Sequence, residues 1–442
     1  MTFLTLAVCL GCMIVVLHGT RETAAARAVG GSVVLAALVP VMSVTDQVSS
    51  STALLTVVLL CATAQVRSGF RPASGTLWGA GIFALFGGWL ILRTVGQFSA
   101  DSTILNIAMV STAIAVAMIV PHLRHADLRP LATVFLVLSL IVTVYAFCEQ
   151  LRVVDTAWPL RQSSLESIDE RANVLVPWLT GRSQASFGHP IPFAVFLSVA
   201  TLVLLHAAIE TRRWRFALGA AVSLAGLSLS GTRSAVVALL VALLTYLVAN
   251  VRWRRLLALT ALTGVLSIGA LLTDLPKLLS LDDSFGSSVS FVHRTLVADS
   301  WSSLWSQPDA RLWIGAGAGG TAELFRSGVV RGARNLIYFD NMYISLFALF
   351  GLTALVLLAG VFLWALRGGA LAMSTTAFLA VMGFSFDEQQ WQISLILLAF
   401  SALMPRSFGS LSRRQSALAA PGSPMADAPF LRPRDTMTAE SA

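Results

Sequence analysis

Some arginines of this 442-residue chain lie outside its basic loops, at positions where they could bind an anion. Every second loop between its apolar stretches is basic, and the positive-inside rule assigns those loops to the cytoplasm. Arg182, Arg233, Arg294 and Arg311 fall on the opposite predicted side. An arginine at a membrane boundary is costly unless it is paired, reaches water or binds an anion. Phosphate is a suitable ligand, because the planar guanidinium donates paired hydrogen bonds and stays charged.

Acid–base groups accompany these arginines on the same predicted side. His189 stands before an apolar stretch, His293 is next to Arg294, and Asp340-Asn341 opens another apolar stretch. Asp340 either caps the helix start or is a general base that takes a proton from a hydroxyl. The two histidines are competing bases, because imidazole titrates near neutral pH, and each also has a structural interpretation. We predict His189 and Asn341 as substrate contacts.

Arg233 is the arginine that snorkelling into water explains least. It lies in a turn of a few residues between two short apolar stretches. We therefore predict that Arg233 binds an anion, with an ion pair to a carboxylate as the alternative. Arg294 has the same two interpretations, whereas Arg182 and Arg311 either bind substrate or face solvent and phospholipid headgroups.

A glycine-rich run, Gly315 to Gly320, contains the pattern G-x-G-x-x-G. This pattern indicates dinucleotide binding only between a strand and a helix, and here it lies in an outer loop of a helical chain. We predict instead a closely approached backbone, with N–H groups at Gly315 and Gly317 facing an anion.

Nothing in the sequence indicates a cofactor. Cys9 and Cys12 form a C-x-x-C inside an apolar stretch without a second pair, and no zinc-ligand spacing or Walker sequence occurs. We expect no metal and no nucleotide.

Composition indicates an all-α, polytopic membrane protein, since 56% of the residues are hydrophobic and 12% are charged. The net charge of +8 is explained by topology and by attraction to anionic lipid rather than by nucleic acid. We predict about 13 transmembrane helices (12–14), with the N-terminus outside and the C-terminus in the cytoplasm. They cover residues 2–18, 28–44, 52–66, 76–95, 103–120, 131–149, 190–209, 216–230, 234–250, 256–273, 341–366, 370–386 and 390–404.

The last two spans have an alternative as one re-entrant hairpin, because Asp387-Glu388-Gln389-Gln390 interrupts them. Two long extracytoplasmic loops also break the pattern of short connections. The second carries Trp301, Trp305 and Trp313, which predict an amphipathic helix on the membrane surface or packed over the bundle. The predicted parts are helices 1–6 in 1–150, a first loop in 151–189, helices 7–10 in 190–273, a large loop in 274–340, C-terminal helices in 341–404 and a disordered cytoplasmic tail in 405–442.

Four local patterns resemble the O-antigen ligase and Wzy-type polymerase family of bacterial cell-surface glycan assembly. The resemblance covers residues 180–400, and the shared order of the patterns carries it more than any single one. They are Gly188-His189-Pro190; Leu229-Ser230-Gly231-Thr232-Arg233-Ser234-Ala235; Arg294 followed by Trp301, Trp305, Pro308 and Gly315-Ala316-Gly317; and Asp340-Asn341-Met342-Tyr343-Ile344 followed by Phe350-Gly351-Leu352.

The resemblance implies a metal-independent, inverting glycosyltransferase in the bacterial plasma membrane, with its site on the extracytoplasmic face. The implied donor is an oligosaccharide linked to a polyprenyl diphosphate, such as undecaprenyl diphosphate, and the diphosphate sits between Arg233 and Arg294. The hydroxyl of a glycan or lipid-linked glycan is the implied acceptor, and Asp340 or His293 assists its deprotonation. Membrane lipids and other glycan-assembly proteins are the further partners.

One position departs from the family. The ligase branch carries a histidine, considered catalytic, where this chain has Asp340. Aspartate has a lower reference pKa than histidine and is therefore a weaker base. The change favours a polymerase slightly over a ligase.

Two other functions are consistent with outer arginines or with many helices. A transporter or flippase for a lipid-linked or anionic substrate predicts polar residues at the membrane midplane and repeat symmetry, and the sequence shows neither. A scaffold that recruits glycan-assembly proteins does not require the outer arginines.

Overall fold

The computed structural model describes residues 2–41, 47–69, 77–155, 157–158, 173, 175–176, 178–179, 181–249, 289–333, 336–406 and 408. These residues form helices joined by turns, and no strand occurs among them. Every predicted span that lies within the described residues has a helix in the structure. The helices of this bundle are α1 (Thr2–His18), α2 (Ala24–Leu38), α3 (Gln47–Ser68), α4 (Leu77–Thr94), α5 (Ala100–Ile119), α6 (Leu128–Gln150), α7 (Pro190–Thr211), α8 (Trp214–Ser230), α9 (Arg233–Ala249), α17 (Met342–Ala365), α18 (Ala370–Met382) and α19 (Gln392–Leu403).

Six of the described helices are long and apolar enough to cross a membrane, and shorter apolar helices accompany them. The span predicted at 256–273, most of the first long loop and most of the tail lie outside the described residues, so the total of about 13 stays a prediction. The predicted end of the second span, at residue 44, is wrong, because α2 ends at Leu38. Val39 precedes Pro40, and a residue before proline is disfavoured in helical conformation.

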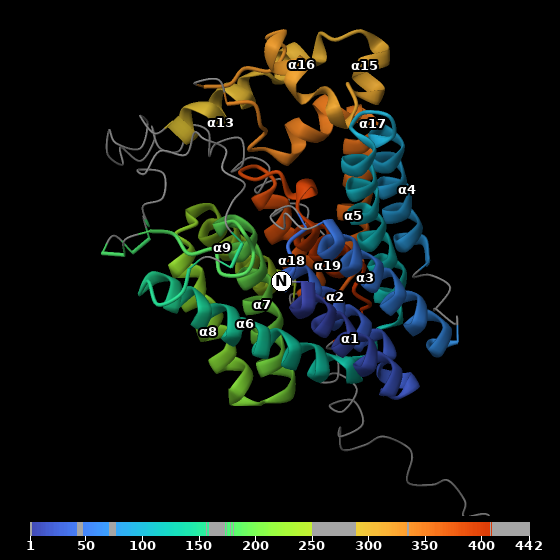
Figure 1. Cartoon of the computed structure of the whole chain (residues 1–442), viewed down its shortest axis with the longest axis vertical. Coiled ribbons are helices and arrows are strands. Elements are labelled where there is room, and N and C mark those ends of the chain that lie inside the picture. The colour runs from blue at the N-terminus through green and yellow to red at the C-terminus, as the bar shows by residue number, and fades with distance from the viewer. Residues whose placement is uncertain are drawn as a thin grey trace, which may run out of the picture.

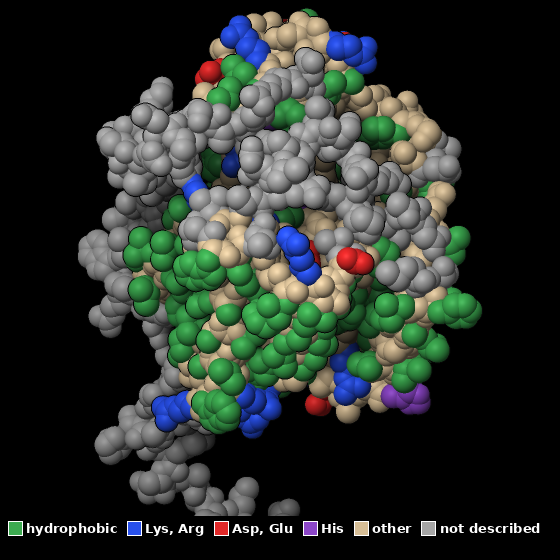
Figure 2. Space-filling model, turned by 60° about the vertical axis from the view of Figure 1, so that its left-hand side comes forward, with side chains coloured by type: hydrophobic (Ala, Val, Ile, Leu, Met, Phe, Trp, Pro, Cys, Tyr) green, Lys and Arg blue, Asp and Glu red, His purple; other side chains and the backbone are tan. Residues whose placement is uncertain are grey.

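Helix α7 is the centre of the bundle. It packs against α6, α8, α9 and α18, and 89% of its most apolar window is buried, against 39–56% for the other five candidate spans. A helix that is apolar on all sides is expected in such a position. The outer helices expose leucines such as Leu85, Leu140 and Leu240, which suits contact with lipid. Figure 2 shows apolar side chains over the body, and basic side chains at its lower rim, at the top and at a few places between them.

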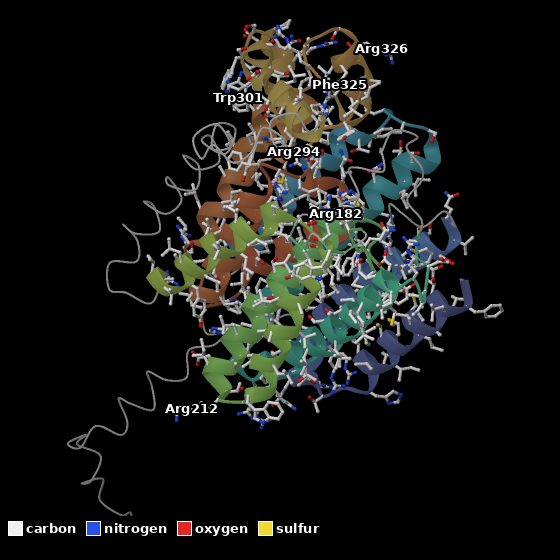
Figure 3. All side chains as sticks on the ribbon, turned by 90° about the vertical axis from the view of Figure 1, so that its left-hand side faces the viewer. Arg182, Arg212, Arg294, Trp301, Phe325 and Arg326 are labelled. Carbon is white, nitrogen blue, oxygen red and sulfur yellow. The ribbon has the colours of Figure 1, made fainter. Side chains whose placement is uncertain are left out.

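The second long loop contributes four short helices at one end of the bundle (Figure 1). They are α13 (Val289–Asp299), α14 (Trp301–Trp305), α15 (Asp309–Ile314) and α16 (Thr321–Arg326). Arg212, from the turn between α7 and α8, lies at the opposite end of the molecule from Arg294 and Arg326 (Figure 3). The two ends that the sequence assigns to different sides of the membrane are therefore separate in the structure.

The three tryptophans of this loop do not share one helix. Pro308 separates α14 from α15, so Trp301 and Trp305 lie on α14 and Trp313 lies on α15. The rings of Trp301 and Trp305 pack on Phe347 of α17, with centroid distances of 5.0 and 5.1 Å. All three indoles remain partly exposed. They thus combine packing over the bundle with a surface suited to the membrane interface.

Helix α17 is broken at Gly351, whose φ of 75° and ψ of 179° are not helical. Carbonyl groups just before such a break lose their helical partners, and within a membrane they need others. The backbone N–H of Ala316 donates to Ala348 O at 2.9 Å, and that of Gly317 donates to Leu349 O at 2.8 Å. The indole N–H of Trp89 donates to Phe350 O at 2.8 Å. The glycine-rich run is thereby joined to the break.

Helix α4 holds the same run from the other side. Arg93 donates from Nε to Ile314 O at 2.9 Å and from Nη2 to Gly315 O at 3.2 Å. The hydroxyl of Thr353, just after the break, donates to Trp313 O at 2.8 Å. Residues 313–317, Arg93 and the broken turn of α17 therefore form one hydrogen-bonded seam.

Replacing Gly351 by alanine is expected to prevent correct assembly of this seam. A left-handed φ strains a residue with a Cβ by about 1–3 kcal/mol, and the added Cβ would overlap the Trp313 carbonyl. We expect less folded protein in membranes and a lower thermal midpoint of the purified protein. Gly88→Ala on α4 is the control, because nothing lies within 4 Å of its added Cβ. Equal levels and midpoints for both variants would contradict the role assigned to the break.

Helices α18 and α19 have 13 and 12 residues, so they span only about 20 and 18 Å of a hydrocarbon core that is about 30 Å thick. Residues 383–391 connect them, and Asp387 and Glu388 within this connection are buried. Separate spans and a re-entrant hairpin both remain consistent with these lengths.

Candidate functional site

Arg294 and Asp340 form an ion pair above the bundle. Arg294 extends from α13, and Asp340 stands two residues before α17. Arg294 Nε donates to Asp340 Oδ2 at 3.2 Å, and the two side chains are 36% and 16% exposed. Only one guanidinium nitrogen is used in this pair, so the remaining N–H groups of Arg294 can serve a ligand. The pair joins the large outer loop to the start of a membrane helix.

Asn341, and not Asp340, caps α17. Its side-chain oxygen accepts the backbone N–H groups of Tyr343 at 3.0 Å and Ile344 at 3.1 Å. Its Nδ2 donates to Phe384 O at 3.3 Å. Because this amide satisfies the free N–H groups of the helix start, Asp340 is left available for Arg294. The geometry gives Asn341, predicted as a substrate contact, a structural role.

His293 is fully buried, and protein groups occupy both of its ring nitrogens. Nε2 lies 2.9 Å from Tyr338 O, and the backbone N–H of Ala333 donates to Nδ1 at 3.2 Å. These two partners require the neutral ring with its proton on Nε2. The rings of Phe325 and Tyr338 lie against it. His293 therefore fixes the segment that leads to Asp340 and has no nitrogen left for a substrate proton.

Arg182 fastens the turn between α8 and α9. Its Nε donates to Ser230 O and its Nη2 to Thr232 Oγ1, both at 2.9 Å. Gly231, at the centre of the turn, has a φ of 63° and lies against the Arg182 side chain. Arg233 follows directly as the first residue of α9 and is partly exposed. The structure thus gives Arg182 a positioning role beside Arg233.

His189 caps α7 and lies among cationic groups. Its Nδ1 accepts the backbone N–H of Ile191 at 3.2 Å, which places the ring proton on Nε2. Burial, and then the positive charges of Arg182 and Arg294, lower the pKa of His189 to about 3. His189 is therefore a neutral hydrogen-bond donor at physiological pH. The charges of Arg182 and Arg294 both act on the His189 imidazole, so the segment before α7 and helix α13 lie close together in the structure.

The segment before α7 is held by a residue that the sequence did not single out. Glu149, near the end of α6, accepts the backbone N–H groups of Gln184 at 3.2 Å and Ala185 at 3.0 Å. Ala185 has a φ of 48°, an uncommon conformation for a residue with a Cβ. A carboxylate at the end of an apolar stretch was the only signal in the sequence. Glu149 positions the loop that carries Arg182 and His189.

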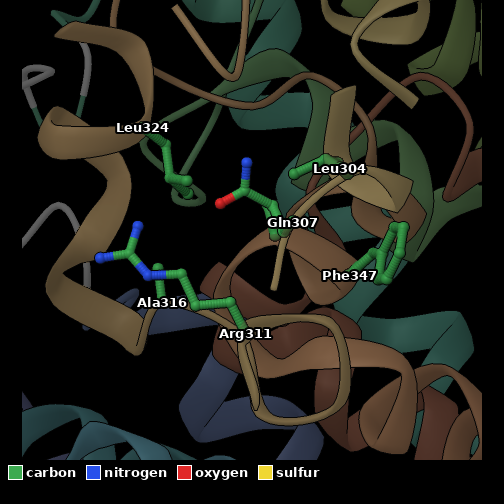
Figure 4. Close-up of a pocket in the computed structure, with 7 residues that line it drawn as sticks. Leu304, Gln307, Arg311, Ala316, Leu324 and Phe347 are labelled. Atoms are coloured by element: carbon green, nitrogen blue, oxygen red, sulfur yellow. The ribbon is translucent and has the colours of Figure 1, made fainter. Parts of the chain in front are cut away.

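Arg311 is remote from the pair of Arg294 and Asp340 in its contacts. Its Nη2 donates to Glu323 at 2.9 Å on an exposed surface. It also lines a small pocket formed with residues of α14, α16 and α17 (Figure 4). The pocket is lined by Leu304, Gln307, Arg311, Ala316, Leu324, Phe347 and Ala348. This surface ion pair gives Arg311 a partner other than a substrate.

The close backbone approach predicted at the glycine-rich run is present, because a Cβ on Gly315 would overlap the backbone of Leu349 and Phe350. The N–H groups that were predicted to face an anion donate to protein carbonyls in this structure. The N–H of Gly315 donates to Arg311 O and that of Gly317 donates to Leu349 O. Within the part of the chain that the structure describes, no group of three His, Cys, Asp or Glu side chains is placed to hold a metal ion.

One family of known proteins matches part of the chain. The family model described as O-antigen ligase matches residues 218–359. This segment contains Arg233, Arg294 and Asp340, whereas Arg182 and His189 lie before it. No curated protein matches the chain. Over residues 218–359 this membrane protein is therefore similar to the O-antigen ligases, the family that its sequence patterns resemble.

Proposed function

We propose that this protein transfers a glycan from a polyprenyl-diphosphate-linked oligosaccharide to an acceptor hydroxyl at the extracytoplasmic face of the bacterial plasma membrane. The observation that carries the proposal is the ion pair of Arg294 and Asp340, which lies within the segment matched by the O-antigen ligase family. It combines an anion-binding group and a base at one place. No metal takes part in the proposed reaction.

The arginines bind the donor diphosphate. Among the described residues Arg294 uses only Nε for Asp340, and Arg233 starts α9 beside the turn that Arg182 holds. A diphosphate between them gains charge when its bond to the sugar breaks, and positioned cations stabilise that charge in the transition state. His189 adds a neutral N–H donor to the same group.

Asp340 accepts the proton of the attacking hydroxyl. When the diphosphate takes the N–H groups of Arg294, Asp340 is released from part of its ion pair. The acceptor oxygen forms a bond to the anomeric carbon from the face opposite the diphosphate, and the old carbon–oxygen bond breaks with its electron pair on the diphosphate. The hydroxyl proton passes to Asp340, so atoms and charges balance in this step. His293 is not the base in this proposal, because its nitrogens are occupied.

Polymerisation of the glycan is favoured over ligation, because the ligase branch of the resembled family has histidine at the position of Asp340. Three partly exposed tryptophans, on α14 and α15, support a position of the outer helices at the lipid surface from which the donor would come. A flippase or transporter is the alternative, and it requires no acceptor.

Deletion of the encoding gene followed by glycan analysis tests the proposal. Accumulation of single lipid-linked repeat units identifies a polymerase, and accumulation of full-length lipid-linked polymer identifies a ligase. Complementation with the intact gene restores the polymer in both cases. A block that leaves the lipid-linked units on the cytoplasmic face would identify a flippase and would contradict glycan transfer.

A further inference from the structure

The connection between α18 and α19 contains two adjacent buried carboxyl groups. Asp387 and Glu388 are 4% and 1% exposed, and among the described residues neither forms an ion pair with a cation. Burial of an ionised carboxylate without such a partner is costly, so groups in this position take up protons. They lie after the segment matched by the O-antigen ligase family, which ends at residue 359.

The hydrogen bonds of the two groups are incomplete. Gln390 Nε2 donates to Asp387 Oδ2 at 2.7 Å. The other oxygen of Asp387 and both oxygens of Glu388 have no hydrogen-bond partner among the residues that the structure describes. Asp387 therefore has one carboxylate oxygen that is held and one that can take a proton.

The connection lies against the elements that carry the proposed site. The backbone N–H of Met342 donates to Gly383 O at 2.7 Å, and Gln389 Nε2 donates to Ser345 Oγ at 2.7 Å. Both bonds tie the connection to the start of α17, just after Asp340. On its other side the ring of Trp391 lies 5.6 Å from that of His189.

The negative charge of Asp340, which precedes α17, acts on Asp387, and the charge of Asp387 acts on its chain neighbour Glu388. The charge of Glu388 acts on Tyr343 of α17, and His189 lies beside Trp391 on the other side of the connection. Burial, and to a smaller extent the negative charge of Asp340, raise the pKa of Asp387 to about 7. Burial, and then the charge of Asp387, raise the pKa of Glu388 well above its usual value.

We propose that Asp387 receives the proton that Asp340 removes from the acceptor hydroxyl. The proposal rests on the proposed glycan transfer. The proton leaves the hydroxyl oxygen for a carboxylate oxygen of Asp340 and then moves to Oδ1 of Asp387, so that Asp340 is again a carboxylate. Asp387 releases the proton to water after the product has left. Asp387 acts through Asp340 and touches no substrate.

A pH profile tests the proposal with purified full-length protein in proteoliposomes, supplied with lipid-linked oligosaccharide isolated from cells that lack the gene. Below pH 7 Asp387 is protonated and cannot accept, so the wild-type rate is expected to rise with pH through about pH 7 and then level off. In Asp387→Asn we expect a rate lower by on the order of tenfold and loss of this rise, a smaller loss than removal of the base itself would cause.

Glu388→Gln is the matched control, because it makes the same carboxyl-to-amide change at the next buried residue, which the proposed proton path does not use. Its rate and profile are expected to equal those of the wild type. Infrared spectroscopy gives a second readout that does not need turnover: a protonated-carboxyl band that titrates near pH 7 is expected in the wild type and in Glu388→Gln, and is absent in Asp387→Asn.

The outcomes separate this proposal from the proposed function. A wild-type profile in Asp387→Asn, or a titrating band that survives in that variant, overturns the proton transfer to Asp387. Carboxylates that stay ionised throughout the titration would indicate a bound cation and would overturn it as well. If the variants of Arg294 and Asp340 described below retain full transfer, the proposed function itself is wrong.

Discussion

Arg294→Ala is expected to abolish the surface polymer in cells and to lower transfer by purified protein by on the order of 10²–10³, the cost of removing one preorganised group that stabilises transition-state charge. The variant loses the anion-binding group and leaves Asp340 without its ion-pair partner. Arg294→Lys keeps the charge but not the fork of N–H groups, so it should recover only part of the rate. Polymer amount and chain length on gels, together with the rate in proteoliposomes, measure the effect.

Arg326→Ala is the matched control, because Arg326 is exposed on α16 at the same end of the molecule (Figure 3). It should leave the polymer unchanged at equal protein level. Normal polymer in Arg294→Ala, with normal membrane insertion, would remove Arg294 from the mechanism.

Asp340→Asn is expected to lower transfer by about 10²–10⁴, the usual contribution of a general base. An asparagine has nearly the same shape and still accepts a hydrogen bond from Arg294, so binding of the donor should change little. The expected signature is a reduced kcat with a nearly constant KM. Asp340→His introduces the residue of the ligase branch and should retain more activity than the asparagine variant.

Asp299→Asn serves as the comparison, since Asp299 is an exposed carboxylate at the end of α13. If Asp340→Asn transfers glycan as fast as Asp299→Asn does, Asp340 is not the base. The electrostatic role of Arg294 could then still stand, because the two substitutions remove different groups.

The positions of the apolar helices could be predicted because each span is marked by an uninterrupted apolar stretch. Gathering of the outer polar residues was also predictable from the alternation of basic loops. His189 lies close enough to Arg182 and Arg294 for their charges to lower its pKa, and Arg294 lies far from Arg212 of a predicted cytoplasmic loop (Figure 3). Loop charge and apolar length are local properties that a single sequence contains.

The partners of the site residues could not be predicted, because they depend on contacts between distant segments. The sequence left open whether Asp340 caps α17, and the structure gives that role to Asn341. The sequence made His293 a candidate base, whereas in the structure its two ring nitrogens are hydrogen-bonded to Tyr338 and Ala333. Arg93 is separated by more than two hundred residues from the carbonyls it holds. Such pairings follow from tertiary packing and not from the type of residue.

The seam at Gly351 has a mechanical consequence for access to the site. Backbone hydrogen bonds from Ala316 and Gly317, and the hydrogen bond from the side chain of Arg93, attach the outer helices to the membrane helices. Outer helices that are held in this way are not expected to move away from the bundle to admit a bulky ligand. We therefore expect a long-chain substrate to enter laterally from the membrane leaflet, with its isoprenoid tail remaining in the hydrocarbon core.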